Sequence, residues 1–158
     1  MCRIWKITIP VRPKAVQSVR GGRGGFFPDR KVVAWKNQIR PYIELACAGG
    51  RPTEYPLRIN AIRYIFKLPS SARPEIRDFV AAGGVIPYVG TADITDNLAK
   101  GLVDTCAGLV FVNDKLIWQT CQTEKIYGIE DGIYIEFEET PDVLTLNGVP
   151  WDADKEER

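Results

Sequence analysis

Hydrophobic and polar residues follow each other along this chain in patterns that predict a few strands. Alternation over residues 3–9 predicts a first strand, and a run rich in Ile, Tyr and Phe predicts a long strand over 57–67. Two further strands are predicted over 116–126 and 132–138. Between the strands predicted over 57–67 and 116–126, another extended piece is expected near 85–89, after a pair of glycines.

Apolar residues recur at helical spacing in other segments. The spacing predicts a helix over 29–47, with an interruption or kink near Pro41, and a second clear helix over 95–109. A short helix is predicted within 72–80. Together the elements predict a small α+β fold, with a mixed or antiparallel sheet of about four strands and two main helices.

The size and composition of the chain indicate one globular domain. The chain has 158 residues, 45% of them hydrophobic, so we expect a folded domain over 1–139 and an acidic, flexible tail over 140–158. No stretch approaches the roughly 18 apolar residues that span a bilayer, and no apolar leader follows Met1. We therefore expect a cytoplasmic protein without a membrane partner.

Charge is distributed unevenly along the chain. Residues 1–63 carry 13 Lys and Arg against 3 Asp and Glu, whereas residues 126–158 carry 2 against 10. A basic first half favours a polyanionic partner, and a solvated surface of mixed charge is the alternative. The basic side chains expected to contact the phosphates of such a partner lie in and after a Gly/Arg-rich loop: Arg20, Arg23, Arg30 and Lys31. A disordered surface loop is the alternative interpretation of this segment. This loop lacks the context of a phosphate-binding glycine motif, so no nucleotide cofactor is expected.

The absence of histidine excludes several kinds of active site. Ser-His-Asp catalysis, Cys-His catalysis and histidine metal ligands are all impossible in a chain without histidine. The four cysteines form no Cys-x-x-Cys pair, so they indicate ordinary thiols rather than a zinc site. Acid–base chemistry near neutral pH must then come from carboxylates, lysine, cysteine or metal-bound water.

Acidic residues gather where the second clear helix is expected to start. Asp93 and Asp96 precede the helix, and Lys100 follows Asp96 by four residues, which places both on one helix face. Thr95 is a candidate N-cap, and capping alone would account for Asp96. Asp104 is interpreted as a salt-bridge partner that orients Lys100.

A third candidate carboxylate, Asp114, follows Asn113 just before a predicted strand, where turn chemistry alone would explain it. Considered together, Asp93, Asp96 and Asp114 offer the hard oxygen ligands that Mg²⁺ or Mn²⁺ prefers. With Lys100 nearby, they form a candidate centre for metal-dependent phosphodiester hydrolysis.

Residues 93–104, followed by 112–117, resemble the RusA family of Holliday junction resolvases. The resemblance rests on Asp96-Asn97-Leu98-Ala99-Lys100 and on the Asn113-Asp114 turn. It implies a homodimeric, Mg²⁺-dependent endonuclease of bacteria and their prophages that cuts four-way DNA junctions with paired nicks. Asp96, Lys100 and Asp114 match the catalytic positions of the family, and Asn97 matches its DNA-contacting asparagine.

The chain departs from the family in the spacing of the first two aspartates. The family has Asp-x-Asp, whereas here two residues separate Asp93 from Asp96. In a strand, residues i and i+3 face opposite sides, so Asp93 joins the site only if residues 94–95 form a bulge or a helical turn. If Asp93 does not join the site, the chain is expected to bind branched DNA without cutting it. A phage structural or interaction protein with no nucleic-acid role is a further alternative. Convergence of Asp93, Asp96 and Asp114 would favour the enzyme.

Overall fold

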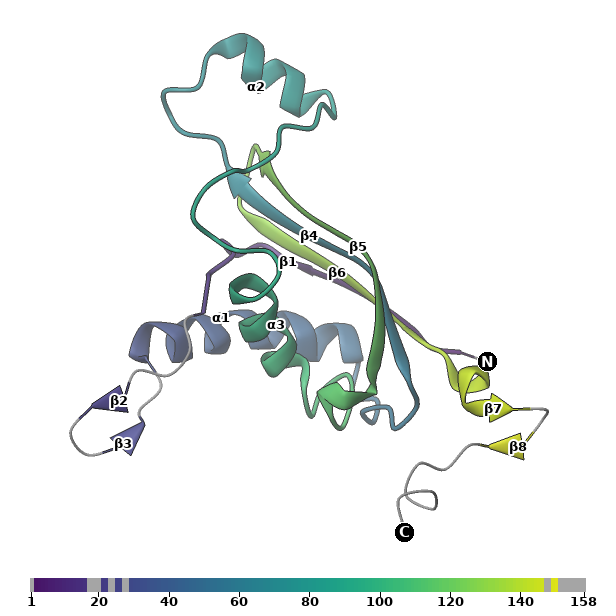
Figure 1. The fold of residues 1–158 in the computed structure, drawn as a ribbon. Helices are drawn as coiled ribbons and strands as arrows, with labels where there is room; N and C mark the ends of the chain where they lie inside the picture. Colours follow the sequence, from purple (N-terminus) through teal and green to yellow (C-terminus); the bar gives the residue numbers. More distant parts are fainter. Residues whose placement is uncertain (1, 17–20, 23–24, 27–28, 147–148, 151–158) are drawn as a thin grey trace.

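The computed structural model describes residues 2–16, 21–22, 25–26, 29–146 and 149–150. Its centre is a four-stranded sheet in the order β1-β6-β4-β5 (Figure 1). The strands are β1 (Ile4–Ile9), β4 (Leu57–Lys67), β5 (Ile117–Gly128) and β6 (Gly132–Glu139). Strand β6 pairs antiparallel with both β1 and β4, and β5 pairs parallel with β4. The mixed sheet confirms the α+β prediction.

Three helices accompany the sheet: α1 (Arg30–Cys47), α2 (Pro74–Ala81) and α3 (Asn97–Cys106). Helices α1 and α3 lie against one face of the sheet, while α2 stands apart beyond the ends of β4 and β5 (Figure 1). The short elements are β2 (Gly21–Gly22), β3 (Gly25–Phe26), η1 (Asp114–Leu116), η2 (Pro141–Leu144), β7 (Thr145–Leu146) and β8 (Val149–Pro150).

The hydrophobic core lies between the sheet and the helices α1 and α3. Strand β1 alternates strictly, with every second residue buried, because successive side chains of a strand point to opposite faces. Helix α1 contributes Trp35, Ile39 and Ile43, which follow one another at intervals of four residues and are buried on one stripe. The alternating residues of β1 and the four-residue stripe of α1, both predicted from the sequence, therefore pack in one core.

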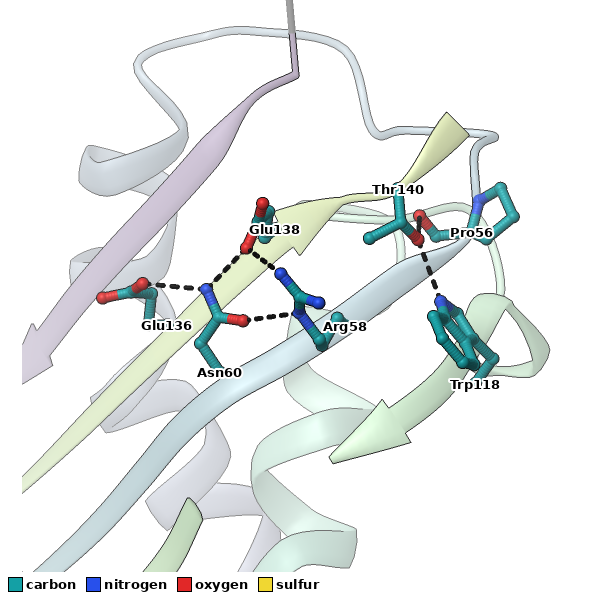
Figure 2. A network of polar contacts seen from close by, with 7 residues as sticks. All are labelled: Pro56, Arg58, Asn60, Trp118, Glu136, Glu138 and Thr140. Atoms are coloured by element: carbon teal, nitrogen blue, oxygen red, sulfur yellow. Dashed lines mark hydrogen bonds and ion pairs between the residues drawn. The ribbon is translucent and has the colours of Figure 1, made fainter. Parts of the chain in front are cut away.

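The other face of the sheet carries polar side chains that bind one another (Figure 2). The Arg58 guanidinium donates to the Glu138 carboxylate at 2.8 Å and to Oδ1 of the Asn60 side chain at 2.9 Å. The Asn60 amide in turn donates to Glu136 at 2.9 Å and to Glu138 at 2.8 Å. Lys6 on β1 also pairs with Glu136, at 3.8 Å. Cations and carboxylates on this face thus neutralise each other.

Some element boundaries differ from the prediction. The expected extended piece near 85–89 is reduced to one antiparallel bridge between Pro87 and Ile126. Pro41 lies inside α1, which runs through it to Cys47. The predicted tail begins with η2 and the β7–β8 pair, and residues 151–158 lie outside the described residues. Among the helices of the described part, none is long and apolar enough to cross a membrane.

An ion pair between exposed Arg3 and buried Glu139 closes the sheet at the end of β6. Glu139 is only 4% exposed, and its carboxylate accepts from the Arg3 amide at 3.0 Å and from the Arg3 Nε at 2.8 Å. Burial by itself raises the pKa of Glu139, but hydrogen bonds from Thr53 and Arg3 outweigh it and leave this pKa below its usual value. The ionised carboxylate therefore stabilises the fold.

We expect Glu139→Gln to lower the free energy of unfolding by about 1–3 kcal/mol at pH 7. The folded-state pKa lies below the unfolded value, so the stabilisation is complete above about pH 4.5 and is lost as the pH falls through the folded pKa. Urea unfolding at pH 7 and at pH 3 measures both effects. As a control, Glu130→Gln removes a carboxylate whose side chain is 74% exposed and should change stability little at either pH. If Glu139→Gln lowers the free energy of unfolding as much at pH 3 as at pH 7, the ionised carboxylate of Glu139 is not the source of the stabilisation.

Candidate active site

The first acidic residue of the motif, Asp93, lies in a turn that leads into α3. Its carboxylate accepts hydrogen bonds from the Thr95 hydroxyl at 2.7 Å and from the Thr95 amide at 2.8 Å. The hydroxyl bond first, and then the amide bond, hold the pKa of Asp93 below its usual range. The carboxylate is therefore ionised at neutral pH, as a carboxylate ligand of a metal must be, and its side chain is exposed.

Asp96, rather than Thr95, is the N-cap residue of α3. The expectation for Thr95 is wrong because its hydroxyl and amide both donate to Asp93. The Asp96 side chain makes no hydrogen bond that caps the helix, although it lies where the helix dipole favours an anion. Capping therefore does not account for the Asp96 carboxylate, which is exposed beside the turn.

The wide spacing of the two aspartates is accommodated by a turn, not by a strand. The Leu98 amide donates to the Asp93 carbonyl at 3.0 Å, which closes the turn around residues 94–97. Strand alternation therefore does not separate Asp93 from Asp96. The structure meets the condition under which the sequence allows both aspartates to serve one site.

Lys100 and Asn97 lie on the first turns of α3. The Lys100 amide donates to the Asp96 carbonyl at 3.2 Å, so Lys100 stands one turn beyond Asp96, and its side chain is exposed. Asn97 is half-buried, and its carbonyl accepts from the Val16 amide at 2.9 Å. This bond links the segment after β1 to the turn that carries Asp93 and Asp96, called the acidic turn below.

Helices α1 and α3 pack closely around Gly101. A Cβ atom at this position would lie 2.4 Å from a Val16 methyl carbon and 3.0 Å from the Trp35 ring, so only glycine fits without movement. One turn further, Asp104 pairs with Lys36 of α1 at 3.1 Å. The expected pairing of Asp104 with Lys100 is therefore wrong, because a tertiary partner on α1 takes this carboxylate.

The segment before the acidic turn is bound to β5. The Tyr88 amide donates to the Lys125 carbonyl at 3.0 Å, and the Tyr127 amide donates to the Ile86 carbonyl at 2.9 Å. The Lys125 ammonium donates to the carbonyl oxygens of Gly90 at 3.3 Å and Ala92 at 2.5 Å. Lys125 was missed by sequence reasoning because no local pattern joins a strand residue to a turn more than thirty positions earlier.

Asp114, the third candidate ligand, begins η1 and is exposed. The preceding Asn113 accepts from the Lys115 amide at 2.9 Å, so this residue has the turn role that its position suggests. Asp114 lines a surface depression of about 330 Å³ together with Asp104, Ala107, Val112 and Asn113. Its acidic neighbour is therefore Asp104, at the C-terminal end of α3.

The acidic turn and Asp114 lie at opposite ends of α3 in one chain. Ten helical residues span about 15 Å. Along β5, Lys125 beside the turn and Ile117 after η1 are eight residues apart, or about 26 Å. Over the described residues, no three Asp, Glu, Cys or His side chains gather as a metal site would require. One chain therefore brings Asp93 and Asp96 onto one turn but does not bring Asp114 to them.

Two of the predicted DNA-contacting side chains lie at the start of α1. Arg30 and Lys31 are exposed, and neither forms an ion pair within the described part of the chain. They stand about one turn before Trp35, which packs on Gly101 beside Lys100. Arg20 and Arg23 lie outside the described residues.

The donor set of the acidic turn fits a hard divalent cation. Two exposed carboxylates, one of them held ionised, are ligands of the kind that Mg²⁺ and Mn²⁺ take, and at least one more protein ligand is usual for a catalytic site. The turn therefore presents two ligands of the kind such a site uses, and among the described residues Asp114 of the same chain does not gather with them.

Comparison with known proteins gives a match that is much longer than the motif. The family model for endodeoxyribonuclease RusA matches residues 8–138. The match runs from β1 to β6 and includes the acidic turn, α3 and Asp114. A search of curated proteins gave no significant match. The match thus extends from the end of β1 over the three helices and the other strands of the central sheet.

Proposed function

This chain belongs to the RusA family of endodeoxyribonucleases, and we propose that it is a Mg²⁺-dependent enzyme that resolves four-way DNA junctions by paired nicks. Mn²⁺ would substitute for Mg²⁺. The enzyme would act as a homodimer in the cytoplasm of a bacterium or of a prophage host. The observation that carries the proposal is the turn that presents two carboxylates one helical turn before Lys100. Asp93 is held ionised, and the side chain of Asp96 makes no hydrogen bond that caps the helix.

Each residue of the turn has a distinct chemical role in this proposal. Asp93 and Asp96 would hold the metal ion, which when bound lowers the pKa of a coordinated water and stabilises charge on the scissile phosphate. Lys100, exposed one turn beyond Asp96, would neutralise a phosphate oxygen. Asn97 would contact DNA at the helix start, where backbone amides favour an anion.

A homodimer would supply what one chain lacks. Two symmetric nicks require two active sites related by a two-fold axis. Because Asp114 lies about one helix length from Asp93 and Asp96 in its own chain, Asp114 of the partner subunit is the candidate third ligand. Each site would then combine the acidic turn of one subunit with the η1 carboxylate of the other.

The distribution of charge supports DNA binding on the helical side. The open sheet face carries glutamates, of which Glu138 is paired with Arg58 (Figure 2) and Glu136 with Lys6. In contrast, Arg30, Lys31 and Lys100 form no ion pair with any described residue and are exposed. Phosphates would bind these unmatched cations, with affinity that falls steeply with salt. Contacts of Arg20 and Arg23 with DNA stay predictions.

A second candidate function is a module that binds branched DNA without cutting it. The separation of Asp114 from the acidic turn in one chain favours this alternative, because two carboxylates alone would hold a metal weakly. The same cations would then recognise the junction by its shape and backbone.

Cleavage of a labelled four-way junction tests the proposal, with Asp96→Asn compared against the native chain. We expect paired nicks in Mg²⁺, a rate at least about 100-fold lower in Asp96→Asn, and retained junction binding in both proteins. The matched control is Asp78→Asn on exposed α2, which should cleave normally. Tight binding without cleavage in Mg²⁺ or Mn²⁺ would favour the binding module. A chain that neither binds nor cuts junctions would refute both functions.

A further inference from the structure

Lys125 contacts the segment that leads into the acidic turn through its side chain as well as its backbone. Its ammonium donates to the carbonyl oxygens of Gly90 and Ala92, the latter directly preceding Asp93. The same ammonium lies 5.7 Å from the centroid of the Tyr88 ring. One part-buried cation thus contacts three residues of the six that precede Asp93.

Other contacts hold the upstream part of this segment without Lys125. Tyr88 stacks on Phe66 with ring centroids 3.8 Å apart and meets Tyr127 edge-on at 5.2 Å. The bridge between Pro87 and Ile126 adds backbone pairing to β5. Beyond Tyr88 these contacts end, Val89 is 87% exposed, and the chain meets the core again only with the small side chain of Ala92. From Gly90 to Ala92, the Lys125 ammonium is the tertiary hydrogen-bond donor that the structure shows.

We infer that Lys125 is a positioning residue, which holds the turn bearing Asp93 and Asp96 in place by binding the carbonyl oxygens just before it. The role in catalysis rests on the function proposed above, whereas the restraint of the turn does not. Lys125 donates to the backbone and so leaves the Asp93 carboxylate to its Thr95 bonds and to a metal.

A positioning role and a purely electrostatic role predict opposite effects on metal binding. A cation close to two carboxylates opposes the binding of a divalent ion, so its removal should strengthen binding if charge is all that matters. If Lys125 positions the turn, its removal lets the two carboxylates sample more positions. Metal binding must then order them, and this cost lowers the affinity for Mn²⁺. The sign of the change in Mn²⁺ affinity therefore separates the two roles.

The test compares Lys125→Met and Lys125→Arg with the native chain by amide hydrogen exchange and Mn²⁺ titration. In Lys125→Met, exchange across 89–98, including the Leu98 amide that closes the turn, should rise about tenfold while α1 is unchanged. Mn²⁺ affinity should fall several-fold. Arginine also donates to two carbonyls, so Lys125→Arg should restore both readouts. Lys6→Met, which removes a lysine from the open face, is the matched control and should change neither.

Two results would overturn the inference: native exchange across 89–98 in Lys125→Met, or Mn²⁺ affinity that rises in that variant. Junction cleavage adds a third readout, because Lys125→Met should lower kcat with little change in junction Kd. Failure of the proposed function would look different, since the native chain itself would then neither cut junctions nor bind Mn²⁺. The exchange measurement would still decide whether Lys125 restrains the turn.

Discussion

Mixing Asp96→Asn protein with Asp114→Asn protein should restore junction cleavage that neither variant shows alone. If each site joins Asp96 of one subunit to Asp114 of the other, a mixed dimer contains one site with both changes and one site with neither. The intact site should nick its strand at a normal rate. With free exchange of subunits, about half of the dimers are mixed, so about a quarter of native activity returns, as single rather than paired nicks.

The measurement is the nicking of a labelled junction after the two variants are refolded together in equal amounts. The matched control mixes Asp93→Asn with Asp96→Asn, whose carboxylates lie on the same turn of one chain, so every site of a mixed dimer is damaged and no activity should return. If the first pair also stays inactive, although the native chain cuts, each subunit completes its own site and the shared arrangement is refuted.

Gly101→Ala should lower the free energy of unfolding by about 1–3 kcal/mol, although alanine is the better helix former. The added Cβ would lie 2.4 Å from a Val16 methyl carbon, so Val16 and its bond to the Asn97 carbonyl must move. Chemical denaturation of the native and variant proteins gives the loss. The segment after β1 would shift at the same time, because Val16 lies in it and its amide binds the Asn97 carbonyl.

The double variant Val16→Ala, Gly101→Ala provides the control for this steric explanation. Removing the Val16 methyl groups creates room for the new Cβ, so the second change should cost clearly less in the Val16→Ala background than in the native one. Additive losses would show that the cost of Gly101→Ala arises elsewhere than at the contact with Val16.

The local elements and the motif could be predicted from the sequence because both depend on neighbours within a few positions. Alternation over residues 3–9 became β1, and the i, i+4 stripe of Trp35, Ile39 and Ile43 became the buried side of α1. The motif residues Asp96 and Lys100 lie one helical turn apart for the same reason. These relations need no knowledge of the rest of the fold.

Local periodicity does not indicate which residues far apart in the sequence are in contact. The predictions that proved wrong depend on such contacts. Asp104 has Lys100 one turn away, yet Lys36 of α1 takes it, because packing of α1 on α3 around Gly101 brings that ammonium closer. The extended piece near 85–89 forms a single bridge with β5, at Pro87 and Ile126, and the Tyr88 ring also stacks on Phe66 of β4.

By itself the sequence determined the strands, the helices, the chemistry available without histidine and the motif that places the chain in its family. Only the tertiary structure decided that Lys125 binds the turn before Asp93, and that α3 separates Asp114 from that turn. The physical reason is that a chain's local pattern sets which face each side chain takes. The order of strands and the packing of helices set which faces meet, and those depend on contacts between residues far apart in the sequence.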